Sequence, residues 1–437
     1  MRFLAEYTEQ RSMDCTCGKI HSIRTREIRI GSGAIRELPD VLKNCEVSGH
    51  GLIVYDSNTF QAAGTQLSSV LNTAGIPFHD LILPGSHVHA EIRHLPRIRA
   101  ERNSNGCGWL IAVGSGSIND MVKLTASQEK LPYIVVGTAP SMDGFLSANA
   151  AILENGIKKQ HVNLTPPVGA VMDADILKTA PSEMTLAGLG DALGKFTSLT
   201  EWKLNSLCAN EPYCPVTAEL IRSEVLNLLE IAERDPLDSE PFFNALVRTL
   251  LITGIAMQML GNSTPASGGE HYISHALDMY GFAVSGDAPS SHGLQVALGT
   301  GALLQDYRQF FVPSCNHTFR IDRERYKKHI TDWQGLGVDL SGAIHAKLDF
   351  LTQVQSNLAN IDSGEMRKEA AALLALAPKL ESVRRKTGLP ETPEQIGISG
   401  ELFDFARNHA VDMRKRLTLA DFFVLHPSDR NNPGAFS

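Results

Sequence analysis

Three segments in the second half of the chain carry residues that are costly to bury unless they bind something. Asp191 lies among glycines in residues 187–195, His271 and His275 are one helical turn apart, and His292 precedes an apolar segment. One carboxylate and two imidazoles are a usual ligand set for a catalytic divalent metal that leaves positions open for a substrate. We therefore interpret Asp191, His292 and one of the other two histidines as metal ligands, although spacing alone does not select between His271 and His275.

Cys15, Cys17 and His21 form a second group of potential metal ligands near the start of the chain. Their Cys-x-Cys spacing differs from the Cys-x2-Cys spacing of common zinc sites, and a fourth ligand is missing. The sequence therefore favours the interpretation that these residues occur here without a metal.

A glycine-rich loop in the first half of the chain has the features of a phosphate-binding turn. Residues 112–120 connect an apolar run to a segment with a helical pattern. Small residues let the backbone approach a pyrophosphate, and the helix N-terminus offers amide donors and a favourable dipole. The loop matches neither the Gly-x-Gly-x-x-Gly fingerprint nor the Walker A loop. Taken alone, it is equally well explained as a plain connection between a strand and a helix.

Asp56 follows the first strongly apolar run, residues 51–55, and is the candidate for the ribose of a dinucleotide. A carboxylate at a strand end can accept hydrogen bonds from both ribose hydroxyls and would repel a 2′-phosphate. In the usual fingerprint the acidic residue follows the glycine loop by about 20 residues, whereas Asp56 precedes it. The alternative is that Asp56 only forms a turn.

The elements that must position these residues change in character near residue 180. Before it, short apolar runs alternate with helix-length segments; the runs are residues 51–55, 81–83, 108–113, 133–136 and 169–172. Such an alternation predicts a mostly parallel sheet with helices on its faces. From Pro181 onward helical periodicity dominates. We therefore expect an α/β N-terminal dinucleotide-binding domain over residues 1–180 and an all-α C-terminal domain, binding metal and substrate, over residues 181–437.

The composition limits the classes of function. The 437 residues carry a formal net charge of -8 without a basic stripe interleaved with aromatic residues, which argues against a nucleic-acid partner. Neither an apolar signal-peptide core nor an apolar run long enough to span a bilayer is evident. Seven cysteines spread over a long chain are typical of a reduced protein. These features predict a cytoplasmic protein that does not span a membrane.

Five segments together resemble the iron-type alcohol dehydrogenase superfamily, and within it the sn-glycerol-1-phosphate dehydrogenase branch. They follow in family order as Val113–Asp120, Thr138–Phe145, Gly190–Ser198, Glu211–Tyr213 and Pro265–His275. The last segment is highly specific, and the glycine loop is much less so. The resemblance implies a dehydroquinate synthase-like fold, in which a dinucleotide-binding domain is joined to a helical metal-binding domain.

The resemblance also implies a role for each candidate residue. It assigns Asp191, His271 and His292 as metal ligands, and it places Asp143, Asp191 and His275 at the substrate, with Asp143 and His275 taking part in catalysis. It places the cofactor, NAD or NADP, against nine residues: Asp56, Gly114, Ser115, Gly116, Ser117, Asp120, Thr138, Ser141 and Ser147. In this superfamily the acidic residue precedes the glycine loop, which accounts for the position of Asp56.

The reaction that the resemblance implies is a reversible, NAD(P)H-linked reduction of dihydroxyacetone phosphate to sn-glycerol 1-phosphate. Its metal is zinc, nickel or iron, and relatives suggest a homo-oligomer, a dimer or larger. Three alternatives stay open: a glycerol dehydrogenase acting on a non-phosphorylated polyol, a sugar-phosphate cyclase similar to dehydroquinate synthase, and an NAD-sensing binding protein. The cyclase is expected to have a glutamate where this chain has Asp191. Tyr272 stands where close bacterial relatives tend to have a histidine, which bears on substrate preference.

A phosphorylated substrate needs local positive groups in a chain of net charge -8. We expect these to be the metal, the helix N-terminal amides near Gly268 and Gly269 or near Ser291, and Lys195. Lys195 lies one turn from Asp191 and could reach the same site; the alternative is that Lys195 is a solvated helix residue.

Overall fold

Packing divides the chain into two units that each have a core of their own. The computed structural model describes residues 12–85, 88–154, 156–311, 321–358 and 363–424. The first unit comprises Met1–Ala192 and Glu240–Ser263, and the second comprises Leu193–Ser239 and Thr264–Ser437. The predicted domain boundary near residue 180 stays a prediction.

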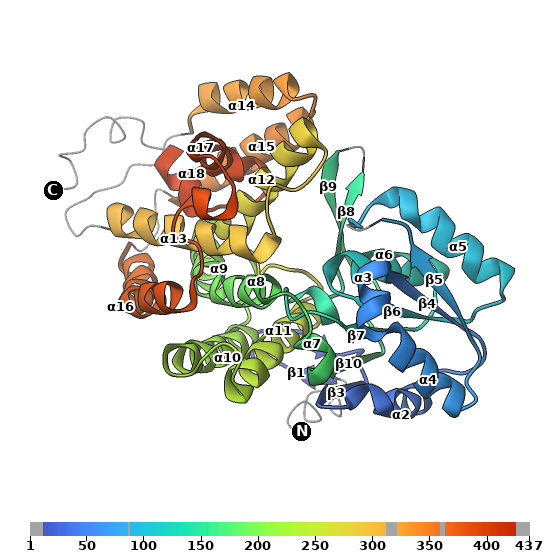
Figure 1. Ribbon diagram of the computed structural model, residues 1–437. Coiled ribbons are helices and arrows are strands. Elements are labelled where there is room, and N and C mark those ends of the chain that lie inside the picture. The colour runs from blue at the N-terminus through green and yellow to red at the C-terminus, as the bar shows by residue number, and fades with distance from the viewer. Residues whose placement is uncertain (1–11, 86–87, 155, 312–320, 359–362, 425–437) are drawn as a thin grey trace. The chain divides into compact units, whose positions relative to one another are not determined.

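A six-stranded sheet, parallel throughout, forms the centre of the first unit (Figure 1). In spatial order its strands are β3 (Glu27–Gly31), β10 (Gly169–Asp173), β7 (Tyr133–Gly137), β6 (Trp109–Gly114), β4 (Gly51–Asp56) and β5 (Phe78–Leu83). Five of these strands correspond to the predicted apolar runs, and β3 is an addition to them. β3 lies at the edge of the sheet, where Arg29 forms ion pairs with Glu27 and Glu37. Charged residues are common on edge strands, and here they obscure the apolar pattern.

Helices cover both faces of this sheet. Ile53 and Tyr55 of β4 belong to the same core cluster as Leu38 of α2 (Leu38–Asn44) and Leu67 of α4 (Thr65–Thr73). The residues that alternate with them in β4 point to the other face and are also fully buried. On that face α5 (Leu95–Ser104) and α6 (Gly116–Glu129) pack on β4. Burial on both faces explains why β4 is an unbroken apolar run.

Two hairpins and several further helices complete the first unit. The hairpins pair β1 (Ser12–Asp14) with β2 (Ile20–Ser22) and β8 (Ala150–Glu154) with β9 (Ile157–His161). The helices are α3 (Ser57–Thr59), α7 (Ala174–Leu177), α8 (Ser182–Leu193) and α11 (Glu240–Leu260), with short turns η2 (Ala34–Glu37), η3 (Phe60–Gly64), η4 (Ile92–His94) and η5 (Gly144–Leu146).

Helix α11 passes the length and hydropathy test for a membrane span, with a mean hydropathy of 1.4 over its most apolar window. However, 83% of that window is buried inside the protein, as expected for a core helix. Gly254 on α11 lies against η5, because a Cβ there would stand 3.1 Å from the carbonyl oxygen of Asp143. The helix therefore supports the loop that carries Asp143.

Among the residues that the structure describes, the second unit contains helices and no strand. Its helices are α9 (Lys195–Ala209), α10 (Pro215–Arg234), α12 (Gly269–Ser285), α13 (His292–Phe310), α14 (Arg323–Gly335), α15 (Ser341–Leu358), α16 (Ser363–Thr387), α17 (Gly400–His409) and α18 (Leu419–Val424), with η6 (Pro393–Ile396) and η7 (Ala410–Asp412). Helix α12 packs against α9, α13 and α17. The predicted fold, an α/β region with a parallel sheet followed by a helical C-terminal region, is confirmed.

Candidate active-site residues

The predicted histidines meet where two packed helices of the second unit begin. His271 lies in the first turn of α12 and His292 is the first residue of α13, and their ring centroids are 5.2 Å apart. His275 follows one turn later on α12, with its ring centroid 6.1 Å from that of His292. Gly299 permits this approach, because a Cβ there would stand 2.7 Å from the carbonyl oxygen of Glu270. Close packing of α13 on the backbone of α12 therefore groups the three rings.

Hydrogen bonds determine which ring nitrogen of His271 and of His292 carries the proton and which has a lone pair for a metal. Nδ1 of His271 lies 2.8 Å from Oε1 of Glu270, and Nδ1 of His292 lies 2.9 Å from Oγ of Ser274. Because Ser274 donates its own proton to Oε1 of Gln295 at 2.6 Å, it accepts a proton from His292. A carboxylate likewise only accepts. Both Nδ1 atoms therefore carry the ring proton, and Nε2 of each ring holds the lone pair that a metal requires.

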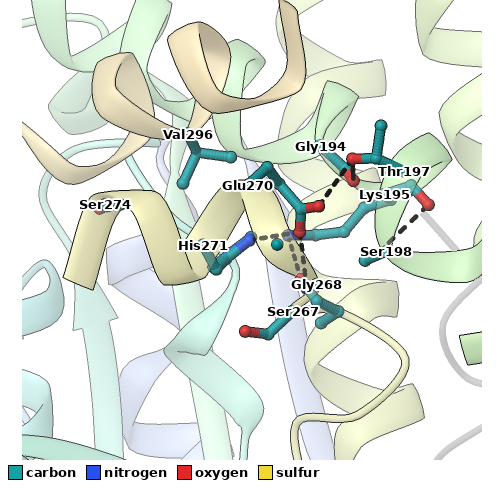
Figure 2. Close-up of polar contacts among 12 residues, drawn as sticks. Gly194, Lys195, Thr197, Ser198, Ser267, Gly268, Glu270, His271, Ser274 and Val296 are labelled. Atoms are coloured by element: carbon teal, nitrogen blue, oxygen red, sulfur yellow. Dashed lines mark hydrogen bonds and ion pairs between the residues drawn. The ribbon is translucent and has the colours of Figure 1, made fainter. Parts of the chain in front are cut away.

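Glu270 is itself held in place by donors from its own helix and from α9 (Figure 2). Its Oε1 accepts from the amide of Gly268 at 2.7 Å, and its Oε2 accepts from the hydroxyl of Thr197 at 2.7 Å. Burial raises the pKa of Glu270, but the hydrogen bonds from His271, Thr197 and Gly268 outweigh burial and lower this pKa below its usual value. Glu270 is therefore an ionised carboxylate that fixes the orientation of His271.

The amides of the two glycines at the start of α12 already donate to side-chain carboxyl groups. Gly268 donates to Glu270, and Gly269 donates to Oε2 of Glu201 at 2.6 Å. Burial, together with the nearby charge of Glu270, raises the pKa of Glu201 to about 8. The expectation that Gly268 and Gly269 bind a phosphate is therefore wrong, because the buried carboxyl groups of Glu270 and Glu201 already accept from these donors.

Lys195 is fully buried, so the alternative that it is a solvated helix residue is also wrong. Its Nζ donates to the carbonyl oxygen of Ala266 at 2.9 Å, and Figure 2 shows its side chain extending from α9 toward the loop that precedes α12. This hydrogen bond ties α9 to the segment that leads into His271.

A buried cluster around Arg416 was not predicted from the sequence. Nε of Arg416 donates to Oε2 of Glu211 at 2.9 Å, and Nη1 donates to the carbonyl oxygen of Ser267 at 2.8 Å. Burial lowers the pKa of Arg416, but Tyr272 and Glu211 more than compensate and raise it above its usual value. The sequence indicated only that the segment containing Glu211 resembles a family segment. The structure shows that Glu211 and Arg416 together support the start of α12.

In the first unit, Asp191 on α8 lies beside the loop that carries Asp143. Oδ2 of Asp191 accepts from the backbone amide of Asp143 at 2.9 Å, and both carboxylates are buried. Gly188 is one turn earlier on α8, and a Cβ there would stand 1.8 Å from the carbonyl oxygen of Pro140. The glycine at this position therefore lets α8 approach the loop closely enough for Asp191 and Asp143 to meet.

Three of the predicted cofactor residues lie at the carboxyl edge of the parallel sheet. Asp56 ends β4, Gly114 ends β6 and Thr138 follows β7. Strands β4 and β6 are neighbours, but the chain after β4 continues to one side, to β5, and the chain after β6 continues to the other side, to β7. Dinucleotides bind open α/β sheets at such a topological switch point. Asp56 and Gly114 therefore flank the place where a dinucleotide is expected.

The glycine loop and the segment that follows β7 contact each other at this edge. Helix α6 begins at Gly116, so Gly116 and Ser117 present the first amides of a 14-residue helix. Oγ of Ser115 lies 2.5 Å from Oγ of Ser141. The tight turn at Gly114 has no room for a side chain, because a Cβ there would stand 2.8 Å from Cβ of Ile118. The two predicted cofactor segments thus form one surface.

Lys123 on α6 joins two predicted cofactor residues and was missed in the sequence. This fully buried side chain donates from Nζ to Oδ1 of Asp120 at 3.2 Å and to Oγ of Ser147 at 3.0 Å. It also donates to the carbonyl oxygens of Gly144 at 3.0 Å and Asn149 at 2.7 Å. Burial lowers the pKa of Lys123, and Asp120 opposes this effect. A lysine flanked by apolar residues in the helix after the loop was the available signal.

Asp56 has a structural role that the sequence had left as an alternative. Its Oδ1 accepts from the amide of Thr59 at 2.8 Å, and Oγ1 of Thr59 accepts from the amide of Asp56 at 3.0 Å. This capping box starts the short helix α3. A ribose contact by the same carboxylate stays a prediction.

Comparison with known proteins agrees with this architecture. The iron-containing alcohol dehydrogenase family matches residues 29–181. The alcohol dehydrogenase from Oenococcus oeni has a similar fold, with a TM-score of 0.59 at 16% sequence identity over 92% of this chain and 98% of that one. At this identity the similarity shows the fold alone.

Sequence relatives are more specific. The glycerol-1-phosphate dehydrogenase (NAD(P)+) of Bacillus subtilis is 37% identical over 273 residues, which are 62% of this chain and 68% of the relative. The enzyme of the same name from Bacillus velezensis is 31% identical over 91% of this chain and 90% of the relative. The chain is an NAD(P)-linked oxidoreductase of the metal-dependent type, and it belongs to the glycerol-1-phosphate dehydrogenase family within the iron-containing alcohol dehydrogenases.

Proposed function

We propose that this enzyme reversibly reduces dihydroxyacetone phosphate to sn-glycerol 1-phosphate with NADH or NADPH. The proposal rests on the names of the relatives and on the orientation of His271 and His292. Because Nδ1 of each ring is hydrogen-bonded to Glu270 or Ser274, Nε2 is the nitrogen that each histidine offers. This orientation supports the proposal that both histidines are metal ligands.

We propose Asp191, His271 and His292 as the ligands of one divalent metal ion. They offer a carboxylate oxygen and two imidazole nitrogens, a donor set that suits zinc, nickel or iron. Oδ2 of Asp191 accepts from the amide of Asp143, and this hydrogen bond holds the carboxylate in place. Such an ion supplies Lewis acidity, which stabilises negative charge on a carbonyl oxygen.

The remaining roles belong to side chains near these ligands. We propose Asp143 and His275 as the proton donors to the substrate oxygen. The backbone amide of Asp143 donates a hydrogen bond to the ligand Asp191. His275 lies one helical turn after the ligand His271, with its ring near that of His292. The paired hydroxyls of Ser115 and Ser141 and the first amides of α6 support the proposed contacts with the cofactor phosphates.

We place the enzyme in the cytoplasm, and we expect a homo-oligomer, a dimer or larger, as the sequence predicted.

Metal removal and replacement test the proposed ligand set. The full chain is treated with a chelator, dialysed and reloaded separately with zinc, nickel or iron, while nicotinamide absorbance is followed with dihydroxyacetone phosphate. We expect turnover to disappear on chelation and to return with at least one metal. His292→Ala should lose both turnover and bound metal. The control is His345→Ala, on the exposed face of α15, which should retain both. Turnover by a demonstrably metal-free chain would contradict the proposal.

A further inference from the structure

Lys123 on α6 binds the segment that follows Asp143. Its side chain is fully buried, and burying an ammonium group is costly unless opposite charge and hydrogen-bond acceptors surround it. Four oxygens lie within hydrogen-bonding distance of Nζ: the carbonyl oxygens of Gly144 at 3.0 Å and Asn149 at 2.7 Å, Oγ of Ser147 at 3.0 Å and Oδ1 of Asp120 at 3.2 Å. Three of these oxygens belong to residues 144–149, so the ammonium group binds this segment to α6.

Two neighbours of Lys123 on α6 bind the same segment and the strand after it. Nδ2 of Asn119, one turn earlier on the same face of the helix, donates to the carbonyl oxygen of Gly144 at 3.3 Å. Oδ2 of Asp120 accepts from the amide of Ala151 on β8 at 2.9 Å. The contacts of α6 therefore cover the whole segment and the start of β8.

The same helix carries the amides that the proposed cofactor site uses. Helix α6 begins at Gly116, and its first amides are assigned to the cofactor phosphates. Asp143, a proposed proton donor, directly precedes Gly144. Gly116 and Lys123 lie two turns apart on one 14-residue helix. The contacts of Lys123 therefore fix Asp143 relative to the start of α6, and all of these residues belong to the first unit.

We propose that Lys123 is a positioning residue, which holds Asp143 in a fixed position relative to the cofactor by binding residues 144–149 to α6. The inference rests on the proposed function, because that function assigns the cofactor to the start of α6 and proton donation to Asp143. Lys123 is hydrogen-bonded to protein oxygens, so it acts through the segment and not on the substrate. Without the ammonium group, two buried carbonyl oxygens lose a charged donor, which favours movement of the segment toward water.

Hydrogen exchange and cofactor binding test this role without turnover. In Lys123→Met, which removes the charge, we expect the amides of residues 143–151 to exchange about tenfold faster or more, because local opening of the segment costs less free energy. The dissociation constant of NADH, measured by fluorescence titration, should rise in the same variant. Val122→Ala is the matched control, because truncating this adjacent buried side chain lowers stability without removing a hydrogen bond. The control should retain its NADH affinity and show no selective increase of exchange in residues 143–151.

Steady-state kinetics with dihydroxyacetone phosphate give a second readout. Lys123→Met should lower kcat by about 10–100-fold, because a proton donor displaced by about 1 Å is no longer aligned with the substrate oxygen. The KM for the ketone should change much less, because the altered residue does not contact the substrate. Val122→Ala should retain the kcat of the unaltered chain.

A double variant keeps the test decisive if Lys123→Met does not fold. Lys123→Met combined with Asp120→Asn removes both charges, so no unpaired buried charge remains, and it should show the same selective exchange. Unchanged exchange of residues 143–151 in the folded variant, or an equal effect in Val122→Ala, would overturn the proposal. If the unaltered chain binds NADH but does not reduce dihydroxyacetone phosphate, the proposed function fails, whereas the exchange and NADH measurements still test the role of Lys123.

Discussion

Oε1 of Glu270 lies 2.8 Å from Nδ1 of His271, the next residue in the chain. Because Gly268 and Thr197 also donate to this carboxylate, its position is fixed before any metal binds. A carboxylate behind a ligating histidine holds the ring orientation and increases the basicity of the other nitrogen.

We therefore expect Glu270→Gln to lower metal affinity by about 10–100-fold, because glutamine can accept the Nδ1 proton but carries no charge. The dissociation constant is measured by competition with a chromophoric chelator, without reference to turnover. Glu224→Gln, a buried glutamate on α10, is the control and should retain the affinity. If Glu270→Gln and Glu270→Ala both bind metal as tightly as the unaltered chain, Glu270 does not position His271.

Gly188→Ala tests the close approach of α8 to the loop that carries Asp143. The added Cβ would stand 1.8 Å from the carbonyl oxygen of Pro140, so the helix or the loop must move. We expect a loss of about 1–3 kcal/mol in the free energy of unfolding, measured by urea denaturation, and a fall in turnover because Asp191 and Asp143 separate. Gly342→Ala on α15, where a Cβ meets nothing within 4 Å, should not be destabilising. Equal stability of the two variants would contradict this account of Gly188.

Asp56→Ala separates the two roles of this carboxylate. Loss of the cap should cost about 1 kcal/mol in stability. If Asp56 also accepts the ribose hydroxyls, the variant should narrow any preference for NADH over NADPH, measured as the ratio of the two kcat/KM values. Thr59→Ala removes the reciprocal hydrogen bond while keeping the carboxylate, so it should leave that ratio unchanged. An unchanged ratio in Asp56→Ala would remove Asp56 from the cofactor site.

The raised pKa of Glu201 predicts a pH dependence of stability whose sign is unusual for a carboxyl group. Its pKa in the folded protein, about 8, lies above the ordinary value of 4.5 because of burial and the neighbouring Glu270. Between these values the folded state binds more protons than the unfolded state, so stability falls as pH rises through that window. The melting temperature of the unaltered chain should fall as the pH rises from 5 to about 8. In Glu201→Gln, we expect this fall to be smaller. The same slope in both proteins would show that Glu201 does not titrate in this range.

The elements with strong periodicity could be predicted from the sequence, whereas several contacts between distant residues could not. The strands that end at Asp56 and Gly114 are unbroken apolar runs because both faces of the sheet are covered. The edge strand β3 was missed because Arg29 and Glu27 interrupt its pattern. His271 and His292 were identified by residue type, but nothing in their spacing indicates that Ser274 orients the second ring.

The occupied amides at the start of α12 illustrate the same limit. The sequence shows Gly268 and Gly269 as an available anion site, but Glu201 lies far away in the chain and reaches Gly269 only in the folded unit. Sequence spacing detects ligands within one turn or hairpin and does not detect the partner that a second element supplies.

The most direct test of the proposed reaction compares dihydroxyacetone phosphate with dihydroxyacetone, using the same metal-loaded enzyme and cofactor. Charge-assisted contacts contribute roughly 1.5–3 kcal/mol each, so recognition of the phosphate should raise kcat/KM on the order of 100-fold or more. The product is then assigned with stereospecific coupling enzymes. We predict sn-glycerol 1-phosphate as the product. Equal use of the two ketones, or formation of the 3-phosphate enantiomer, would contradict the proposed function.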